Sequence, residues 1–245
     1  MADKNNAPAR LDKILASIGI SRADAKKAIA SGRVAVNGVT ERDSGRKVLP
    51  GEVSLDGQPI QAELEVYLMI HKPAGVVTAT EDKRFQTVVD LLPEKYARRK
   101  IGPVGRLDRD VTGLVILTTD GEMAHRLISP KWKAEKLYRA TCEGRLTQKD
   151  VDAFASGMEL SDFTAKPAGM EILSASDGES VADVTLTEGK FHQVKRMFIA
   201  IGHPLTKLER LRIGAVTLDP ALEEGEFRPL TEEEVLSLKK ITGLA

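Results

Sequence analysis

The order of apolar and polar positions predicts a small helical unit at the start of the chain. Apolar residues recur at helical spacing in RLDKILASIGI, which predicts a short amphipathic helix. A second helix is expected over residues 23–30, with Ser21 as its N-cap and Gly32 just after its last turn. Asn37-Gly38 and Asp56-Gly57 are turn dipeptides between short apolar runs, which is typical of hairpins. The pattern therefore predicts two helices followed by hairpins.

From residue 66 onward, strand and helix patterns mix without regular alternation. Strand-like runs are VYLMIHKPAG, LVILTTDG, KLYRATCEG, AKPAGMEIL, SVADVTLTEG and LERLRIGAVTL. Helical runs are TVVDLLPEKY (residues 87–96), GEMAHRL, TQKDVDAFASGM, FHQVKRMFIAIG and the segment after Pro229. Because this order is not a βαβ repeat, we expect an α+β domain with a mixed, largely antiparallel sheet. The predicted organisation is a disordered tail (1–9), a first domain (10–57), a linker (58–65) and a second domain (66–245).

Composition narrows the class of protein. A hydrophobic content of 42% and a charged content of 29% over 245 residues are ordinary for a globular protein. The N-terminus has no apolar run and no window approaches 18 apolar residues, so we expect a cytoplasmic protein with no membrane partner. A monomer is also expected. A single cysteine, Cys142, excludes an internal disulfide and is expected to be half-buried in a strand. The four histidines lack ligand spacing, so no metal is expected.

Charge is distributed unevenly although the net charge is zero. Basic residues outnumber acidic ones between residues 10 and 47, whereas acidic residues concentrate near the C-terminus. On the second predicted helix the basic positions lie opposite the apolar ones. Such a surface could be a solvated face, a docking site for a protein or an RNA-binding site, and its one-sided charge suits contacts with phosphates.

The segment RLDKILASIGISRADAKKAIASGRVAVNGV resembles the S4 RNA-binding domain, and the resemblance runs from Arg10 to about Gly57. It implies that the helices and the hairpin hold structured RNA. The segment has no aromatic residue, so contacts with RNA shape and phosphate are expected rather than stacking on bases. The RNA-binding residues that the resemblance implies are Arg10, Lys13, Arg22, Lys26 and Arg33.

A carboxylate in the second domain stands out by its surroundings. Asp108 lies between Arg106 and Arg109, and the strand-like run LVILTT follows it closely. A carboxylate beside arginines is often only a surface ion pair or a turn cap. However, glycines at 102, 105 and 113 allow a close approach of ligand or chain, and a loop held by a stiff strand is a common place for catalytic groups. Asp108 is therefore a candidate catalytic residue.

The motif GRLDRDVTGLVILTTDG resembles the signature of the pseudouridine synthases. With HKPAGVV, KLYRA and EGKFHQVKRMFIAIGHPLTKLERLRIG, it resembles the RsuA branch of that family over nearly all of the remaining chain. The resemblance implies isomerisation of a uridine in RNA to pseudouridine, which breaks the bond between N1 and C1′ and joins C5 to the sugar. This reaction needs no redox step, and no cofactor is expected.

The resemblance also implies residue roles. Asp108 is the carboxylate, which could attack ribose C1′, attack base C6, or remove a ribose proton. Tyr138 is expected against the target base. Lys195 is expected as the cation that stabilises the ionised carboxylate, with Arg196 as the alternate. Arg106 is expected to hold the flipped nucleotide or to fill the gap that it leaves. Asp110 is a rival carboxylate, but spacing within one loop fixes no separation between the two carboxyl groups.

The predicted substrate is one uridine in 16S ribosomal RNA, in a partly assembled small subunit. The motifs GKFHQVKRMF and GEFRPLTEEE look more like small-subunit enzymes, whereas large-subunit relatives tend to carry arginine in place of His192 or Lys195. A 23S target is the alternative, and a non-catalytic rRNA-binding assembly factor is the alternative from another class. An RNA glycosidase or nuclease is disfavoured because the chain lacks a metal cluster and a histidine-based acid–base pair.

Overall fold

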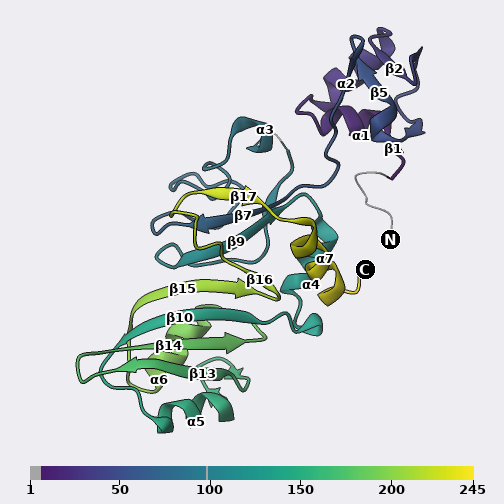
Figure 1. The fold of residues 1–245 in the computed structure, drawn as a ribbon. Helices are drawn as coiled ribbons and strands as arrows, with labels where there is room; N and C mark the ends of the chain where they lie inside the picture. The colour runs from purple at the N-terminus through teal and green to yellow at the C-terminus, as the bar shows by residue number, and fades with distance from the viewer. Residues whose placement is uncertain (1–6, 98) are drawn as a thin grey trace. The chain divides into compact units, whose positions relative to one another are not determined.

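The computed structural model describes residues 7–97 and 99–245, which form two compact units (Figure 1). The first unit runs to Val66 and also contains Leu92–Ile101, and the second contains Tyr67–Leu91 and Gly102–Ala245. Most of the predicted tail, residues 1–6, lies outside the described residues, and Ala9 belongs to a strand. Within the described ranges, no helix is both long and apolar enough to span a membrane.

The first unit has the predicted helix–helix–hairpin order. The Ser21 hydroxyl accepts a hydrogen bond from the Asp24 backbone N–H at 3.1 Å and so caps the second helix. Asn37 and Gly38 both have positive φ, as a tight hairpin turn requires. The elements are β1 (Ala9–Arg10), α1 (Leu11–Ala16), α2 (Arg22–Ala30), β2 (Val34–Val36), β3 (Val39–Thr40), β4 (Lys47–Val48), η2 (Pro50–Glu52), β5 (Val53–Leu55) and β6 (Gln58–Pro59).

The helix predicted over residues 87–96, within the predicted second domain, is much shorter than expected. The pattern in residues 87–96 predicts a helix, but α3 spans only Glu94–Ala97. The Thr87 N–H donates to the Asp90 carboxylate at 2.8 Å, and the Asp90 N–H donates to the Thr87 hydroxyl at 3.2 Å. These reciprocal bonds form the pattern of a capping box, but the turn that they close does not continue as a helix. Pro93 then disfavours helical backbone at the residue before it, so the helix begins only after the proline.

The second unit is built on a nine-stranded sheet with the order β13-β14-β10-β15-β9-β7-β17, in which β16 pairs with β15 and β8 with β9. Among the named strands of the described chain, every pairing in this sheet is antiparallel except that of β9 with β15. The strands are β7 (Tyr67–Lys72), β8 (Gly102–Pro103), β9 (Thr112–Thr118), β10 (Lys136–Glu143), β13 (Gly169–Ala175), β14 (Glu179–Leu186), β15 (Leu205–Ile213), β16 (Val216–Thr217) and β17 (Phe227–Pro229). The predicted α+β class with a mixed, largely antiparallel sheet is confirmed.

Helices pack near both ends of this sheet (Figure 1). α4 (Gly121–Ile128) and α7 (Glu232–Ile241) lie side by side, and α7 contacts β16. At the other end, α5 (Gln148–Ser156) contacts β13, and α6 (Gln193–Ala200) contacts β15. The remaining short elements are η3 (Pro130–Trp132), β11 (Met158–Glu159) and β12 (Thr164–Ala165). α6 begins next to the loop that carries Asp108, so it is the helix that positions the candidate site.

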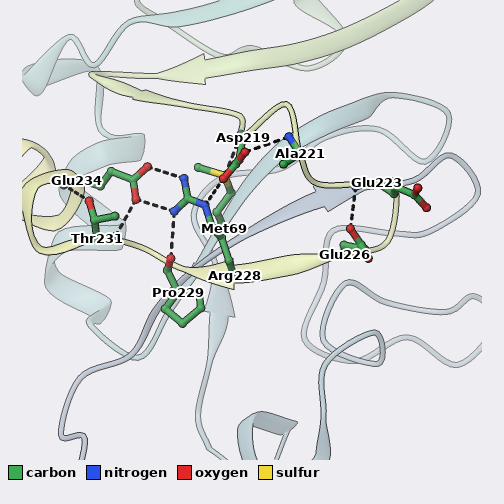
Figure 2. Close-up of polar contacts among 9 residues, drawn as sticks. All are labelled: Met69, Asp219, Ala221, Glu223, Glu226, Arg228, Pro229, Thr231 and Glu234. Carbon is green, nitrogen blue, oxygen red and sulfur yellow. Dashed lines mark hydrogen bonds and ion pairs between the residues drawn. The ribbon is translucent and has the colours of Figure 1, made fainter.

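The acidic C-terminal segment is tied to an edge strand (Figure 2). Arg228 of β17 donates two parallel hydrogen bonds, both 2.8 Å long, to the carboxylate of Glu234, and one of 2.6 Å to Asp219. Glu234 also completes the capping box of α7 with Thr231. The hydrogen bonds from Arg228 hold the pKa of Glu234 below its ordinary value. Glu234, one of the acidic residues near the C-terminus, therefore helps to attach α7 to the sheet.

Candidate active site

A pocket in the second unit is lined from several directions. The lining residues come from the loop between β8 and β9, from the strands β10, β14 and β15, and from the start of α6 with the loop before it. The lining residues are Arg106, Leu107, Asp108, Val111, Tyr138, Leu186, Gly189, Lys190, His192, Gln193, Val194 and Leu208. Two of the predicted catalytic residues, Asp108 and Tyr138, line this pocket together with Arg106.

Backbone contacts hold the loop that carries Asp108. The Thr78 hydroxyl donates to the Leu107 carbonyl at 2.9 Å and accepts from the Leu107 N–H at 3.1 Å. The Val111 N–H donates to the Asp108 carbonyl at 3.2 Å. The loop is thus bonded on both sides of the aspartate, which restricts where the carboxylate can lie.

Lys72, at the end of β7, donates hydrogen bonds to the same loop. Its side chain is completely buried, and its ammonium donates to the carbonyls of Pro73, Arg109 and Val111 at 2.9, 3.2 and 2.7 Å. Burial lowers the pKa of Lys72 to about 8, although the carboxylates of Asp110 and Asp108 act in the opposite direction. Sequence reasoning assigned no role to Lys72, although the motif HKPAGVV contains it.

The Asp108 carboxylate has two cationic or ionisable neighbours. The Lys195 ammonium of α6 lies 3.0 Å from one carboxylate oxygen, and Nε2 of His192 lies 3.3 Å from the other. The Asp108 side chain is 29% exposed, so it remains open to a ligand in the pocket. Lys195 is thus the predicted cation that lies beside Asp108.

Lys195 also binds the rival carboxylate. Its ammonium donates to both oxygens of Asp110, at 2.7 and 2.9 Å. This hydrogen bonding lowers the pKa of Asp110 below its ordinary value. Burial acts to lower the pKa of Lys195, but the hydrogen bonds and charges of Asp110 and Asp108 outweigh it, and the net shift is upward. Lys195 is therefore held charged between two carboxylates, of which Asp110 is the more exposed.

The alternate cation, Arg196, has other partners. Its guanidinium donates to the Ser161 hydroxyl at 2.9 Å and to the Asp162 carboxylate, and it lies 4.8 Å from the centre of the Phe163 ring. Consecutive residues of a helix point in different directions, which explains why Lys195 and Arg196 bind different groups.

Tyr138 and Arg106 differ in exposure. Tyr138 lies in β10 and is 8% exposed, opposite Arg210 of β15 and Val184 of β14. Arg106 precedes Asp108 by two residues on the loop and is exposed at the pocket rim. The sheet therefore holds the tyrosine in place, while the arginine is accessible to a ligand from solvent.

His192 was not assigned a role from sequence. It is the N-cap of α6 with a left-handed backbone (φ +49°), and its imidazole lies beside the Asp108 carboxylate. In the sequence, the only signal for a role of His192 in the site is its position in the motif FHQVKRM.

The predicted RNA-binding residues of the first unit fall into two groups. Arg10 donates to Asp12 at 3.0 and 2.9 Å, and Arg33 donates to Asp56, so both guanidinium groups already bind a carboxylate. The others, Lys13, Arg22 and Lys26, are exposed on α1 and α2.

Two further sequence predictions concern metals and cysteine. Within residues 7–97 and 99–245, no group of three or more histidine, cysteine, aspartate or glutamate side chains is arranged to hold a metal ion. Cys142 lies in β10 as predicted, but it is fully buried rather than half-buried, because β10 is an inner strand. Burial raises the pKa of its thiol.

Comparisons with known proteins agree with this architecture. Residues 66–200 match the family RNA pseudouridylate synthase, and residues 9–61 match the S4 domain. The ribosomal small subunit pseudouridine synthase A of Escherichia coli is 43% identical over 235 residues, which cover 94% of this chain and 99% of that protein. An uncharacterized RNA pseudouridine synthase of Bacillus subtilis is 43% identical over 230 residues, covering 92% and 96%. A crystal structure of a pseudouridylate synthase matches with a TM-score of 0.67 and 37% identity, over 94% of this chain and 99% of the other.

The fold and the pocket define an RNA-modifying enzyme with a separate RNA-binding unit. The chain belongs to the RNA pseudouridylate synthase family, in its RsuA branch, and carries an N-terminal S4 domain. It is an RNA pseudouridine synthase, an isomerase that acts on uridine.

Proposed function

We propose that this enzyme isomerises one uridine of 16S ribosomal RNA to pseudouridine, with Asp108 as the catalytic carboxylate. The observation that carries the proposal is the position of Asp108, whose carboxylate lines a pocket with Tyr138 and is 3.0 Å from the Lys195 ammonium. A non-catalytic RNA-binding protein would have no need of this combination.

The roles of the three residues follow from the reaction. The glycosidic bond between N1 and C1′ breaks, the base turns, C5 bonds to C1′, the proton on C5 leaves, and N1 takes up a proton. An ionised Asp108 can act at C1′, at C6 or on a ribose proton, and Lys195 stabilises its charged form. The largely buried Tyr138 has a ring to pack on the base and a phenol within the pocket.

A target uridine must leave its stack to reach this pocket. Flipping costs a few kcal/mol of stacking and pairing in RNA. Arg106, exposed at the rim, is suited to bind the backbone of the flipped nucleotide or to occupy the space that it vacates. The exposed Lys13, Arg22 and Lys26 of the S4 domain supply phosphate contacts that position the RNA.

The proposed 16S target rests on likeness to the Escherichia coli enzyme, whose name assigns it to the small subunit and whose sequence is matched over 99% of its length. A uridine reachable only before the subunit closes would make partly assembled subunits the substrate. Mapping tests this directly: pseudouridines are located by carbodiimide-dependent primer-extension stops across both rRNAs, in cells with and without the gene. Loss of one 16S stop is expected, and loss of a 23S stop with all 16S stops retained would assign the enzyme to the large subunit.

The carboxylate is tested by the variant Asp108→Asn, which keeps the shape of the side chain and removes its charge. We expect tritium release from RNA labelled at uridine C5 to be abolished while RNA affinity and melting temperature stay close to wild type. Asp110→Asn is the matched control because Asp110 binds the same lysine, and it should retain substantial turnover. An active Asp108→Asn together with an inactive Asp110→Asn would move the catalytic role to Asp110.

A further inference from the structure

Phe191 is an aromatic residue left in solvent beside the active site. It lies in the loop between β14 and α6 and is 75% exposed, a larger fraction than any other large apolar residue of the described chain. Burial of a phenylalanine side chain stabilises a protein, and this ring forgoes most of that gain. The ring therefore offers an apolar aromatic surface close in the chain to residues that line the pocket.

The ring is held in a defined position. It stacks on the imidazole of His192 with 3.8 Å between the ring centres and an angle of 19° between the planes. The loop itself is fixed by buried Gln193, whose side chain accepts from the Lys190 N–H at 2.9 Å and donates to the Glu188 carboxylate at 2.7 Å. One face of the Phe191 ring is therefore covered by His192, and the high exposure leaves the opposite face open to solvent.

The position of the ring relative to the pocket indicates what could cover it. Lys190 and His192, on either side of Phe191, line the pocket, whereas Phe191 itself does not. The imidazole under the ring is 3.3 Å from Asp108. The open face is thus just outside the space that would receive the target uridine.

Charge near the ring suits a nucleic acid. Lys190, the residue before Phe191 in the chain, is exposed and lines the pocket, so it places a positive charge at the pocket next to this loop position. Single-stranded RNA is commonly bound by an aromatic ring that stacks on a base and by cations that contact the adjoining phosphates.

We propose that Phe191 is a stacking platform for the nucleobase next to the target uridine in the RNA. When the uridine is flipped out, its neighbour loses a stacking partner, and the open face of Phe191 replaces that partner. The His192 ring beneath it keeps the platform rigid, so little conformational freedom is lost on binding. This inference rests on the proposed function in that it assumes a uridine flipped into the pocket of Asp108.

The test compares four full-length variants. Phe191→Ala removes the ring, Phe191→Leu keeps apolar bulk without an aromatic face, and Phe191→Trp keeps the face. Ile199→Ala is the matched control, because Ile199 is another exposed apolar residue, 63% exposed, on the neighbouring helix α6. Affinity for 16S and 23S transcripts is measured by filter binding, and kcat and KM by tritium release from the same transcripts.

We expect Phe191→Ala and Phe191→Leu to weaken RNA binding and raise KM by about 5- to 100-fold, with kcat at saturating RNA and melting temperature near wild type. Phe191→Trp should bind within about 3-fold of wild type, and Ile199→Ala should bind as wild type does. A fall in kcat at unchanged affinity would show that the ring only supports His192 and would overturn the proposal. Unchanged affinity in Phe191→Ala would overturn it as well.

A second measurement locates the base. A 2-aminopurine base placed on either side of a uridine in a short single-stranded RNA should lose fluorescence on binding wild-type protein, and the loss should be absent with Phe191→Ala. Equal quenching by the two proteins on both sides would contradict the proposal. These binding readouts need no turnover, so failure of the proposed function, seen as no tritium release from 16S RNA by the wild type, is distinguished from failure of this inference.

Discussion

At the scale of single residues, Lys195 connects the two carboxylates of the Asp108 loop. Its ammonium is 3.0 Å from Asp108 and 2.7 Å from Asp110, and the adjacent Arg196 binds Asp162 instead. Because Lys195 and Arg196 bind different carboxylates, substituting each of them separately can distinguish their roles.

Substitution Lys195→Met should lower kcat by at least about 100-fold, because it removes the cation that stabilises the charged carboxylate in the pocket. Lys195→Arg should retain part of the activity because the charge remains. Arg196→Met is the control and should affect kcat much less. Single-turnover tritium release measures these rates, and a Lys195→Met enzyme with the wild-type rate would assign the lysine to the surface ion pair with Asp110 alone.

Lys72 predicts a pH dependence of stability. Its pKa is lowered to about 8 in the folded protein from 10.5, so between these values the unfolded chain binds more protons than the folded one. The contribution of Lys72 to the free energy of unfolding should therefore increase as pH rises from 8 to 10.5, by up to about 3 kcal/mol.

The measurement is urea unfolding of wild type and Lys72→Met at pH 7.5 and pH 10. The difference in unfolding free energy between the two proteins should grow in favour of wild type at the higher pH. A difference that is constant with pH would show that Lys72 titrates as it does in the unfolded chain.

At the scale of elements, the parallel pairing of β9 with β15 joins two antiparallel parts of the large sheet. Arg210 of β15 lies opposite Gly113 of β9, and Gly113 has φ +105°. A Cβ atom at position 113 would be 2.3 Å from the Arg210 carbonyl oxygen and 2.6 Å from its nitrogen. Glycine is therefore required here both by conformation and by the close approach of the two backbones.

Substitution Gly113→Ala should destabilise the protein by more than about 3 kcal/mol or prevent folding, because both strands would have to move apart. Gly121→Ala is the matched control, because no atom lies within 4 Å of its added Cβ and residue 121 is helical. It should change stability by less than about 1 kcal/mol, in the stabilising direction. Thermal melting of both variants gives the comparison, and a Gly113→Ala protein that melts near the wild-type temperature would contradict the geometry.

At the scale of the whole molecule, the predicted phosphate contacts of the S4 domain and the candidate active site lie in different units. The S4 domain carries exposed cations on α1 and α2, while the pocket with Asp108 and Tyr138 belongs entirely to the second unit. Phosphate contacts release counterions, so the dependence of affinity on salt reports how many of these cations are used.

The double variant Arg22→Gln/Lys26→Gln should weaken RNA binding and reduce the slope of log affinity against log salt by about 1.4 to 1.8, at roughly 0.7–0.9 per phosphate contact. Arg22 and Lys26 belong to the first unit, and the residues that line the pocket belong to the second. The turnover number kcat at saturating RNA should therefore be retained. Lys149→Gln/Lys240→Gln, exposed on α5 and α7, serves as the control. An unchanged salt slope in the first variant would remove these residues from the interface.

Local patterns by themselves determined much of this protein. Ser21, the Asn37-Gly38 turn and the alternation of apolar residues predicted the helices and hairpins of the first unit correctly, because caps and tight turns depend on residues that are neighbours in the chain. The irregular order of strands and helices predicted the α+β class. The ordered motifs around Asp108, Tyr138 and Lys195 indicated the family, which the comparisons confirm.

Only the tertiary structure decided which groups meet. Lys195 and Arg196 are adjacent in sequence, and no local pattern tells which of them contacts a loop 85 residues earlier; the orientation of α6 against that loop does. The same holds for Lys72, which looks like an ordinary strand residue until β7 and the Asp108 loop are packed together. His192 likewise meets Asp108 only because the start of α6 packs against the loop that carries the aspartate. These contacts depend on long-range packing, because side chains far apart in sequence are brought within bonding distance only when the sheet is assembled.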